Sequence, residues 1–460
     1  MKTRERDFSR GSIFKHMVAF GLPILAANVM QYLYQATDMI VVGQAVGNVG
    51  IVAISNASMI AFVVNSLAIG LAGGGTVAIA RYKGAADEQG QRSASTALFI
   101  LAAVCSAAIA VAGVCGALPV LTALGVPHEA VGMAAAYMAI VCGGSLFTFG
   151  YNASCSLMKG LGDAKAPFVF IGIASIINVV LDVVFVMGFG WGVAGAAWAT
   201  VISQCFSCVF STVHLVRKYS TARPSFRDRA RLRESFAGVL EVGIPATIQM
   251  AVVNLSYLLV TSMLNAYGTD VAAASGVGLK ISTFAGLSCW AIGQAITAMT
   301  GQNAGARKPL RMRSVVRVGL GVSIAVIVAI QVIIQIFAYD LAVWFGASGS
   351  TAIETTVLYL RITCSVNGIC YAAMYCFDSF ALGSGCPRLA LINALLDAVV
   401  VRFGLAWLLG SVMGLGYVGV FASQALSPIL PVIVGWLYYV RGSWRRSYGV
   451  ELREAMRSEV

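Results

Sequence analysis

Two acidic side chains in the first half of this chain fall inside apolar segments. Asp38 lies within the stretch 17–42, and Asp182 lies within the stretch 167–187. A carboxylate at the centre of a membrane helix costs about 2.5–3.5 kcal/mol on insertion scales, so these residues are functional candidates. Asn178 precedes Asp182 by one helical turn, which places both on one helix face. Carboxyl, amide and hydroxyl oxygens together suit a hard cation or a shared proton.

Both acids also have a simpler interpretation. Asp38 could cap the outer end of its helix, and Asp182 could be a hydrated group near a helix end. Under the functional interpretation, burial disfavours the charged form of each carboxyl group, and each negative charge disfavours the other. Such a pair would keep a proton near neutral pH until water entered the surrounding cavity.

Charged residues in the second half are open to either interpretation. Asp378 and Asp397 lie in apolar stretches and could pair with an intramembrane cation, either structurally or functionally. Three such cations occur, at Lys280, Arg361 and Arg402.

Prolines and aromatic residues supply further candidates. At a helix start proline is harmless, whereas deeper in a helix it removes a backbone hydrogen bond and creates a hinge. Pro23 shares its stretch with Asp38, which favours a hinge there. Aromatic faces attract organic cations, although most aromatic residues in a bundle serve packing. The candidate substrate-cavity residues are Gln31, Tyr34, Asn152, Tyr257, Lys280 and Trp290.

Catalytic signatures are missing from the sequence. There is no phosphate-binding GxxxxGK[ST] motif, no Ser/His/Asp grouping and no metal-ligand spacing, and the eleven cysteines are scattered along the apolar stretches. We therefore expect no enzymatic activity and no cofactor beyond a coupling ion.

Positive charge recurs after every second apolar stretch, whereas the intervening loops hold none. Of the 31 Lys and Arg residues, 28 fall in the segments 1–16, 81–92, 159–165, 217–233, 307–317, 388 and 441–460. This alternation follows the positive-inside rule and predicts that both termini are cytoplasmic. The net charge of +12 then reflects orientation and anionic lipid rather than nucleic-acid binding.

Twelve apolar stretches position these residues, each long enough for the roughly 20 residues that a bilayer crossing needs. Residues are 59% hydrophobic and only 11% charged, against about 25% charged in soluble domains. The predicted fold class is an all-α polytopic membrane protein. The stretches are 17–42, 51–80, 93–118, 130–158, 167–187, 193–216, 236–265, 271–301, 314–337, 353–382, 389–409 and 415–440.

The second six stretches repeat the first six. Pro23 and Pro245 lie 222 residues apart in similar contexts, and the Gly-Ala pairs at 84–85 and 305–306 lie 221 apart. Because six is even, both copies share one orientation, which predicts two pseudo-symmetric six-helix bundles around a central cavity. The predicted parts are an amino-terminal lobe (1–216), a basic cytoplasmic linker (217–235), a carboxy-terminal lobe (236–440) and a cytoplasmic tail (441–460).

From about residue 11 to residue 440, the chain resembles the multidrug and toxic compound extrusion (MATE) family. The residues that carry the likeness are Gly21-Leu22-Pro23 with Gln31 and Asp38, Gly84-Ala85 with Asp87, Gly160-Leu161-Gly162-Asp163 with Pro167, Asn178-Val179-Val180-Leu181-Asp182, Gly192 to Thr200, and Gly301-Gln302-Asn303-Ala304-Gly305-Ala306.

The resemblance implies a multi-pass antiporter of a bacterial or archaeal plasma membrane. It would export small-molecule drugs or metabolites in exchange for H⁺ or Na⁺, by alternating access, as a monomer in contact with membrane lipid. Matching residue by residue, the coupling-ion ligands are Asp38, Asn178, Asp182 and Thr200, with Tyr137 beside them.

The chain departs from another branch of this family, which carries a Glu in the seventh span. The corresponding neighbourhood reads Val253-Asn254 here, and Asp378 sits closer to the following glycine than that branch's acid. We therefore expect no cation site in the carboxy-terminal lobe.

Two other functions remain as alternatives. One is a lipid-linked oligosaccharide flippase of the same superfamily, whose cavity would carry several arginines. The other is an intramembrane enzyme, which would need a polar catalytic grouping. Dye efflux that collapses with a protonophore, and not with ATP depletion alone, would favour the antiporter.

Overall fold

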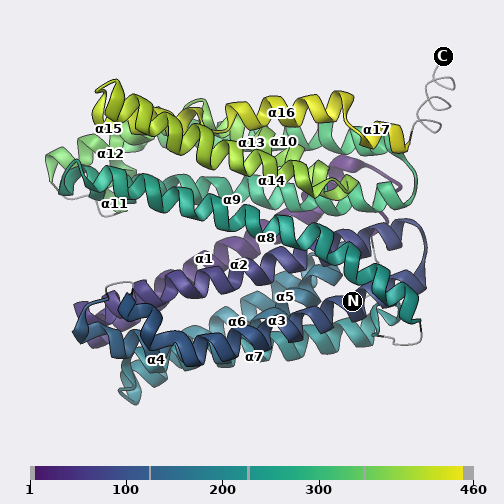
Figure 1. Cartoon of the computed structure of the whole chain (residues 1–460), viewed down its shortest axis with the longest axis horizontal. Coiled ribbons are helices and arrows are strands. Elements are labelled where there is room, and N and C mark those ends of the chain that lie inside the picture. Colours follow the sequence, from purple (N-terminus) through teal and green to yellow (C-terminus); the bar gives the residue numbers. More distant parts are fainter. Residues whose placement is uncertain (1–5, 124–125, 225–227, 346–348, 449–460) are drawn as a thin grey trace. The chain divides into compact units, whose positions relative to one another are not determined.

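The computed structural model describes residues 6–123, 126–224, 228–345 and 349–448, which are mostly helical, with no strand among them. Figure 1 shows the helices in chain order. In the first half they are α1 (Ile13–Val46), α2 (Asn48–Gly84), α3 (Glu88–Ala123), α4 (His128–Gly143), α5 (Ser145–Gly160), α6 (Lys165–Asp182), the π-helix η1 (Val183–Gly188), α7 (Gly192–Lys218) and the short η2 (Ser220–Ala222).

The second half follows the same order of long and broken helices. Its elements are α8 (Arg229–Asn265), α9 (Thr269–Gly305), α10 (Pro309–Ile336), α11 (Ala338–Trp344), α12 (Ser350–Thr363), α13 (Asn367–Ser384), α14 (Pro387–Leu395), the π-helices η3 (Leu396–Leu405) and η4 (Trp407–Val412), α15 (Gly416–Leu426), α16 (Ile429–Arg441) and α17 (Trp444–Ser447).

The predicted twelve spans are present. Ten helical segments of the described chain are long and apolar enough to cross a bilayer. Two further spans are bent pairs: α4 and α5 meet at 46°, and α12 and α13 meet at 49°. Counting each pair as one span gives twelve, and the chain is an all-α multi-pass membrane protein.

The backbone turns repeat from one half to the other. Ala86 and Arg307, 221 residues apart, both adopt a positive φ, of 55° and 53°. Positive φ is uncommon outside glycine, so the same strained turn has been built twice. Gly162 and Gly385 likewise share φ values of 91° and 88°. These matches confirm the internal repeat that the sequence predicts.

The described chain forms two compact units, and the division falls inside two helices. The main body of the first unit is Leu22–Thr247, whereas the second unit combines Phe8–Gly21 with residues 248–448. α1 therefore begins in the second unit and continues in the first, and α8 passes from the first unit into the second. In the sequence-based prediction, by contrast, the amino-terminal lobe ends at residue 216 and the carboxy-terminal lobe begins at residue 236.

Both prolines lie at these crossings. Pro23 sits ten residues into α1 and Pro245 sixteen residues into α8, each within three residues of the boundary between the units. Neither proline therefore lies at a helix start, because α1 and α8 begin before the apolar stretches 17–42 and 236–265. A proline at such a position removes one backbone hydrogen bond and weakens the helix there.

The amino-terminal segment is tied to the second unit by polar contacts. The backbone N–H of Phe8 donates to Gln302 Oε1 at 3.0 Å, and Asn303 Nδ2 donates to the Phe8 carbonyl at 3.2 Å. Arg311 donates to the carbonyls of Phe8 and Arg10. These bonds fix the segment before α1 to the end of α9 and the start of α10.

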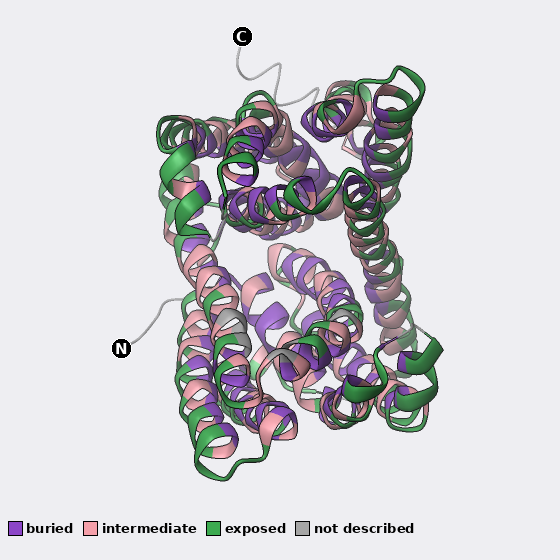
Figure 2. Ribbon diagram, turned by 90° about the vertical axis from the view of Figure 1, so that its left-hand side faces the viewer, coloured by how far each residue is buried: buried purple, intermediate pink, exposed green. Residues whose placement is uncertain are grey.

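Close helix packing explains the glycine cluster of α2. A Cβ atom at Gly70 would lie 2.1 Å from Thr247 Oγ1, and one at Gly74 would lie 2.2 Å from the Val239 carbonyl oxygen. The α2 and α8 backbones thus approach each other as closely as small residues permit. Taken separately, each unit turns buried residues inward and leaves exposed, largely apolar residues on its outer helix faces (Figure 2).

Candidate ion-coupling site

The two acids of the first half meet inside the first unit. Asp38 on α1 and Asp182 at the end of α6 lie within hydrogen-bonding distance of each other. Asp38 is 7% exposed and Asp182 is fully buried. α1 continues two turns past Asp38, and η1 continues the helix past Asp182. Neither the capping nor the hydrated-group interpretation therefore holds.

Three of the four carboxyl oxygens of this pair lack any other donor from the described chain. One oxygen of Asp38 and both oxygens of Asp182 have no donor among the described groups. Two ionised carboxylates can only accept hydrogen bonds, so the contact between Asp38 and Asp182 becomes a hydrogen bond only when one of them carries a proton. A bound cation would satisfy the same oxygens. Without either, two buried negative charges would repel each other.

Tyr137 of α4 lies beside the acid pair. It is close enough to both carboxyl groups to interact with them electrostatically, and its side chain hydrogen-bonds Ser58 of α2. Four helices, α1, α2, α4 and α6, therefore converge on the pair. Ser58 was not predicted as a site residue. It is uncharged and belongs to Asn56-Ala57-Ser58, a pattern that resembles a glycosylation motif rather than an ion site.

Neutral oxygens on α6 and α7 complete the candidate set. Asn178 precedes Asp182 by one turn, and its side-chain oxygen and nitrogen have no partner among the described groups; the same is true of Thr200 Oγ1. α6 and α7 pack against each other. These unpartnered oxygens suit a hard cation such as Na⁺, or water beside a shared proton. In the described chain no three His, Cys, Asp or Glu side chains come together.

An open groove of about 300 Å³ is lined by the two helices that carry the acid pair. It lies between α1, which contributes Tyr34 and Thr37, and α6, which contributes Ser175 and Val179. Thr37 immediately precedes Asp38, and Ser175 lies one turn before Asn178 on α6. Ser175 could have been found from the sequence, because it lies seven residues before Asp182 and so shares its helix face. Thr37 gave no such signal, since adjacent residues on a helix do not share a face.

The predicted substrate-cavity residues divide between the units. Gln31, Tyr34 and Asn152 belong to the first unit, and Tyr34 lines the groove. The Asn152 amide donates to the Thr148 carbonyl in its own helix. In the second unit Lys280 is exposed and Trp290 is half-buried, while the Tyr257 ring packs against a guanidinium group. Their role in substrate binding stays a prediction.

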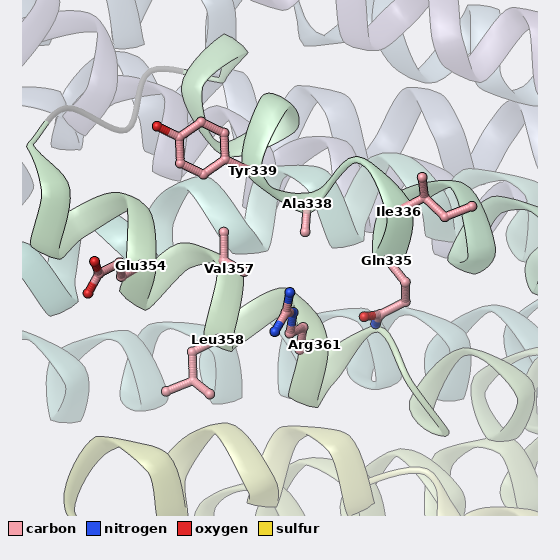
Figure 3. A pocket seen from close by; sticks show the side chains of 8 residues that line it. All are labelled: Gln335, Ile336, Ala338, Tyr339, Glu354, Val357, Leu358 and Arg361. Atoms are coloured by element: carbon pink, nitrogen blue, oxygen red, sulfur yellow. The ribbon is translucent and has the colours of Figure 1, made fainter.

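The second unit has a cavity of its own, away from any acid pair. It measures about 360 Å³ and lies between the end of α10, α11 and α12 (Figure 3). Its polar lining comes from Gln335, Tyr339, Glu354 and Arg361. Gln335 already donates to backbone carbonyls of α12 and the residue that follows it.

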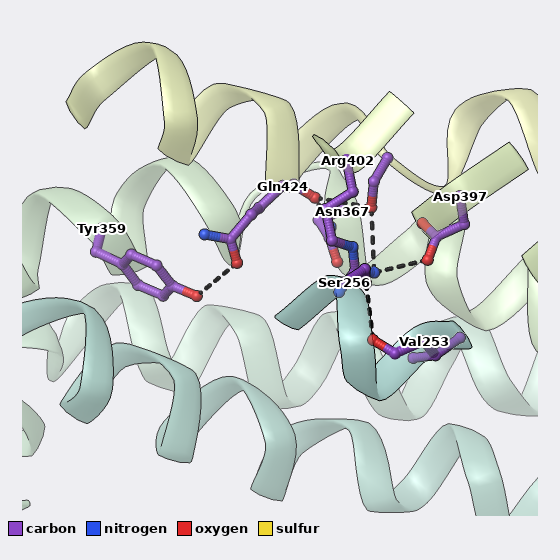
Figure 4. A network of polar contacts seen from close by, with 8 residues as sticks. Val253, Ser256, Tyr359, Asn367, Asp397, Arg402 and Gln424 are labelled. Atoms are coloured by element: carbon purple, nitrogen blue, oxygen red, sulfur yellow. Dashed lines mark hydrogen bonds and ion pairs between the residues drawn. The ribbon is translucent and has the colours of Figure 1, made fainter. Parts of the chain in front are cut away.

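A buried ion pair occupies the second unit (Figure 4). Arg402 Nη2 donates to Asp397 Oδ2 at 2.7 Å, and both side chains are at most 3% exposed. The guanidinium carbon lies 4.1 Å from the centre of the Tyr257 ring, and a longer bond reaches Ser427 Oγ. Of the three intramembrane cations, Arg402 is thus the partner of Asp397.

The π-helix explains how this ion pair forms. In an α-helix, residues five apart point about 140° away from each other. Asp397 and Arg402 are five apart within η3, whose i→i+5 hydrogen bonds bring such residues onto one face. The other candidate acid of the second half, Asp378, accepts a hydrogen bond from Asn393 at 2.6 Å.

Comparisons with known proteins agree with this architecture. The family model described as MatE matches residues 23–184 and again residues 245–408, one match in each half. The chain is 28% identical to the probable multidrug resistance protein YpnP of Bacillus subtilis, over 95% of this chain and 97% of that protein. It is 23% identical to the probable multidrug resistance protein NorM of Thermotoga maritima, over 94% of each.

Solved structures share the fold. A multidrug resistance MATE family transporter of the MOP superfamily, in an outward-facing conformation, matches with a TM-score of 0.90 at 23% identity, over 95% of this chain and 98% of that one. A MATE structure in a bent conformation matches with a TM-score of 0.91, also at 23% identity, over 98% and 100%. At this identity the likeness establishes the fold.

Proposed function

Since this chain belongs to the MatE family, we propose that it is a multidrug exporter driven by the exchange of H⁺ or Na⁺. The observation that carries the proposal is the contact between Asp38 and Asp182, two buried acids of which three carboxyl oxygens have no other donor among the described groups. Names of the relatives, probable multidrug resistance proteins, support small-molecule drugs as the cargo. The chain is not an enzyme.

In the proposed cycle, the external ion binds between the two carboxyl groups. Its charge removes the repulsion between Asp38 and Asp182, and Asn178 and Thr200 supply neutral oxygens when the ion is Na⁺. With H⁺, the proton is held on one carboxyl and donated to the other. Either ion draws α1 and α6 together and narrows the groove between them, which releases cargo bound there.

Alternating access then uses the two proline positions. α1 and α8 are the helices that pass from one unit into the other, and each is weakened by a proline at the crossing. We propose that both bend there, so Pro23 is one of two hinges and Pro245 is the other. A coupling ion that binds on α1 beyond Pro23 can therefore influence how this helix bends.

The driving force comes from the membrane. An inward potential of 100 mV contributes about 2.3 kcal/mol per charge, which corresponds to a gradient of about fiftyfold at equilibrium. We place the protein, as a monomer, in the plasma membrane of a bacterium or archaeon, in keeping with the bacterial sources of its relatives. Both termini then lie in the cytoplasm, because the basic segments recur after every second span.

The proposal is tested by drug efflux from proteoliposomes with a pH or sodium gradient imposed one at a time. Wild-type protein should transport with at least one gradient, and Asp38→Asn should not. Asp270→Asn removes an exposed acid of the second unit and serves as the matched control. Efflux at the wild-type rate by Asp38→Asn would overturn the coupling scheme. Movement of a lipid-linked oligosaccharide in place of a drug would favour the flippase.

A further inference from the structure

The cavity between α10, α11 and α12 carries two charges of opposite sign. Glu354 and Arg361 both lie on α12, seven residues apart, so they share a face with about 10.5 Å between them along the helix axis. Figure 3 shows Val357 and Leu358 on the helix between them. Both charged side chains are exposed, and neither has an ion-pair partner in the described chain.

Aromatic side chains place this cavity at a membrane–water interface. α11 is a short helix between two spans, at the opposite end of the second unit from α17 (Figure 1). Its Tyr339 and Trp344 are 62% and 78% exposed, and Phe337 just before it is half-exposed. Exposed aromatic residues at the end of a span mark the level of the lipid head groups. The cavity therefore opens where head groups lie.

An apolar stripe leads from the cavity toward the membrane interior. Val328, Val332 and Ile336 recur every four residues on α10 and are all exposed, and Ile336 also lines the cavity. Residues at this spacing share one helix face. A ligand with a polar head in the cavity and a hydrocarbon chain along this stripe would match both surfaces.

We propose that this cavity binds a zwitterionic phospholipid with a primary-amine head group, such as phosphatidylethanolamine. Arg361, farther from the start of α12, pairs with the phosphate, and Glu354, nearer that start, pairs with the ammonium group. The acyl chain lies along Val328, Val332 and Ile336. A volume of about 360 Å³ is within the range of ligand pockets, about 300–1,000 Å³. Glu354 disfavours a lipid whose head group is only anionic.

Lipid retention by the purified full-length protein, measured by native mass spectrometry, tests this assignment. Given equal amounts of phosphatidylethanolamine and phosphatidylglycerol, wild-type protein should retain about five times more phosphatidylethanolamine. This ratio corresponds to one exposed ion pair, worth about 1 kcal/mol. Arg361→Gln should lose retention of both lipids. Glu354→Gln should reverse the preference, because it leaves Arg361 alone to hold an anionic head group.

Two controls keep the result interpretable. Asp270→Asn removes an exposed acid at the same end of the second unit, outside the cavity, and should leave the preference unchanged. Leu358→Trp should reduce retention of both lipids by filling the cavity, with an unchanged melting temperature as the check on folding. Equal retention of both lipids by wild-type protein, or no change of preference in Glu354→Gln, would overturn the proposal. So would displacement of the lipid by soluble glycerophosphoethanolamine at an equal concentration, which would indicate a water-soluble ligand.

Discussion

The two halves repeat the same helices but treat buried charge in opposite ways. In the first unit, Asp38 and Asp182 bring two acidic groups together, with no cation from the described chain beside them. In the second unit, Asp397 is paired with Arg402, whose guanidinium also packs on Tyr257. By the repeat, the position of Asp38 corresponds to Val260, a buried apolar residue.

This difference separates a site that needs an external ion from one that supplies its own. A buried pair of opposite charges has no net charge, so it does not need H⁺ or Na⁺ to be stable. In a buried pair of negative charges, the repulsion is relieved only when a proton or a cation is added. The comparison therefore supports the proposal that the first half couples transport to an ion, whereas the ion pair of the second half has a structural role.

The largest expected effect is on transport and comes from the acid pair. Asp38→Asn or Asp182→Asn should reduce gradient-driven efflux to the level of protein-free liposomes, because the remaining carboxyl can no longer share an ion with a second one. The melting temperature should stay the same or rise, since one buried charge is removed. The matched change Asp378→Asn, at a buried acid held by Asn393, should leave the coupling ion and the efflux direction unchanged. Loss of coupling in Asp378→Asn as well would break the comparison.

A large effect on stability is expected from the ion pair of the second unit. Arg402→Gln leaves Asp397 buried without its partner and should destabilise the protein by about 3–5 kcal/mol. Thermal unfolding in detergent measures this loss. The double variant Arg402→Gln/Asp397→Asn should recover most of it, because no unpaired charge remains. If the double variant were no more stable than the single one, charge pairing would not be what Arg402 contributes.

An intermediate effect is expected at Asp163, in the turn between α5 and α6. Burial alone would raise the pKa of Asp163, but hydrogen bonds from Lys218, Tyr219 and the Ala166 backbone N–H outweigh it and hold the pKa below its usual value. The carboxylate accepts from Lys218 at 2.8 Å and from Tyr219 at 2.6 Å. By the repeat, this position corresponds to Cys386.

Because the pKa of Asp163 is lower in the folded state, its contribution is present above the unfolded pKa of about 3.9 and is lost as pH falls through the folded value. Asp163→Asn should cost about 1.5–3 kcal/mol at pH 7 and less in acid, so the stability difference from wild type should shrink below about pH 4. A difference that does not vary with pH would show that the charge of Asp163 is not what matters.

The smallest expected effect concerns the crossing of α2 and α8. Gly74→Ala should destabilise the first unit by about 1–3 kcal/mol, because the added Cβ would press on the Val239 carbonyl oxygen. By the repeat, the second half already has Ala295 at this place, fully buried. Gly73→Ala, whose Cβ would meet nothing within 4 Å, is the matched control and should be neutral or slightly stabilising. Equal melting temperatures for the two variants would contradict the close approach.

The sequence predicted the spans and the repeat because both depend on local signals, namely apolar length and the spacing of Gly, Pro and basic residues. It could not give the depth of Pro23 and Pro245 in their helices, because α1 and α8 begin in polar segments, before the apolar stretches 17–42 and 236–265. It could not pair Asp397 with Arg402, since residues five apart share a face in a π-helix but not in an α-helix. The contact between Asp38 and Asp182 depends on how α1 and α6 pack, which spacing along one helix does not encode.

The central claim is that Asp38 and Asp182 together take up one external ion. Infrared difference spectroscopy of the purified protein tests it most directly, because a protonated carboxyl group and a carboxylate absorb differently. We predict the signal of one protonated carboxyl group near neutral pH, which is lost when the pH is raised or when Na⁺ is added. The same signal should be absent from both Asp38→Asn and Asp182→Asn. Wild-type spectra without any protonated carboxyl and without a response to Na⁺, or a signal that survives in both variants, would contradict the account.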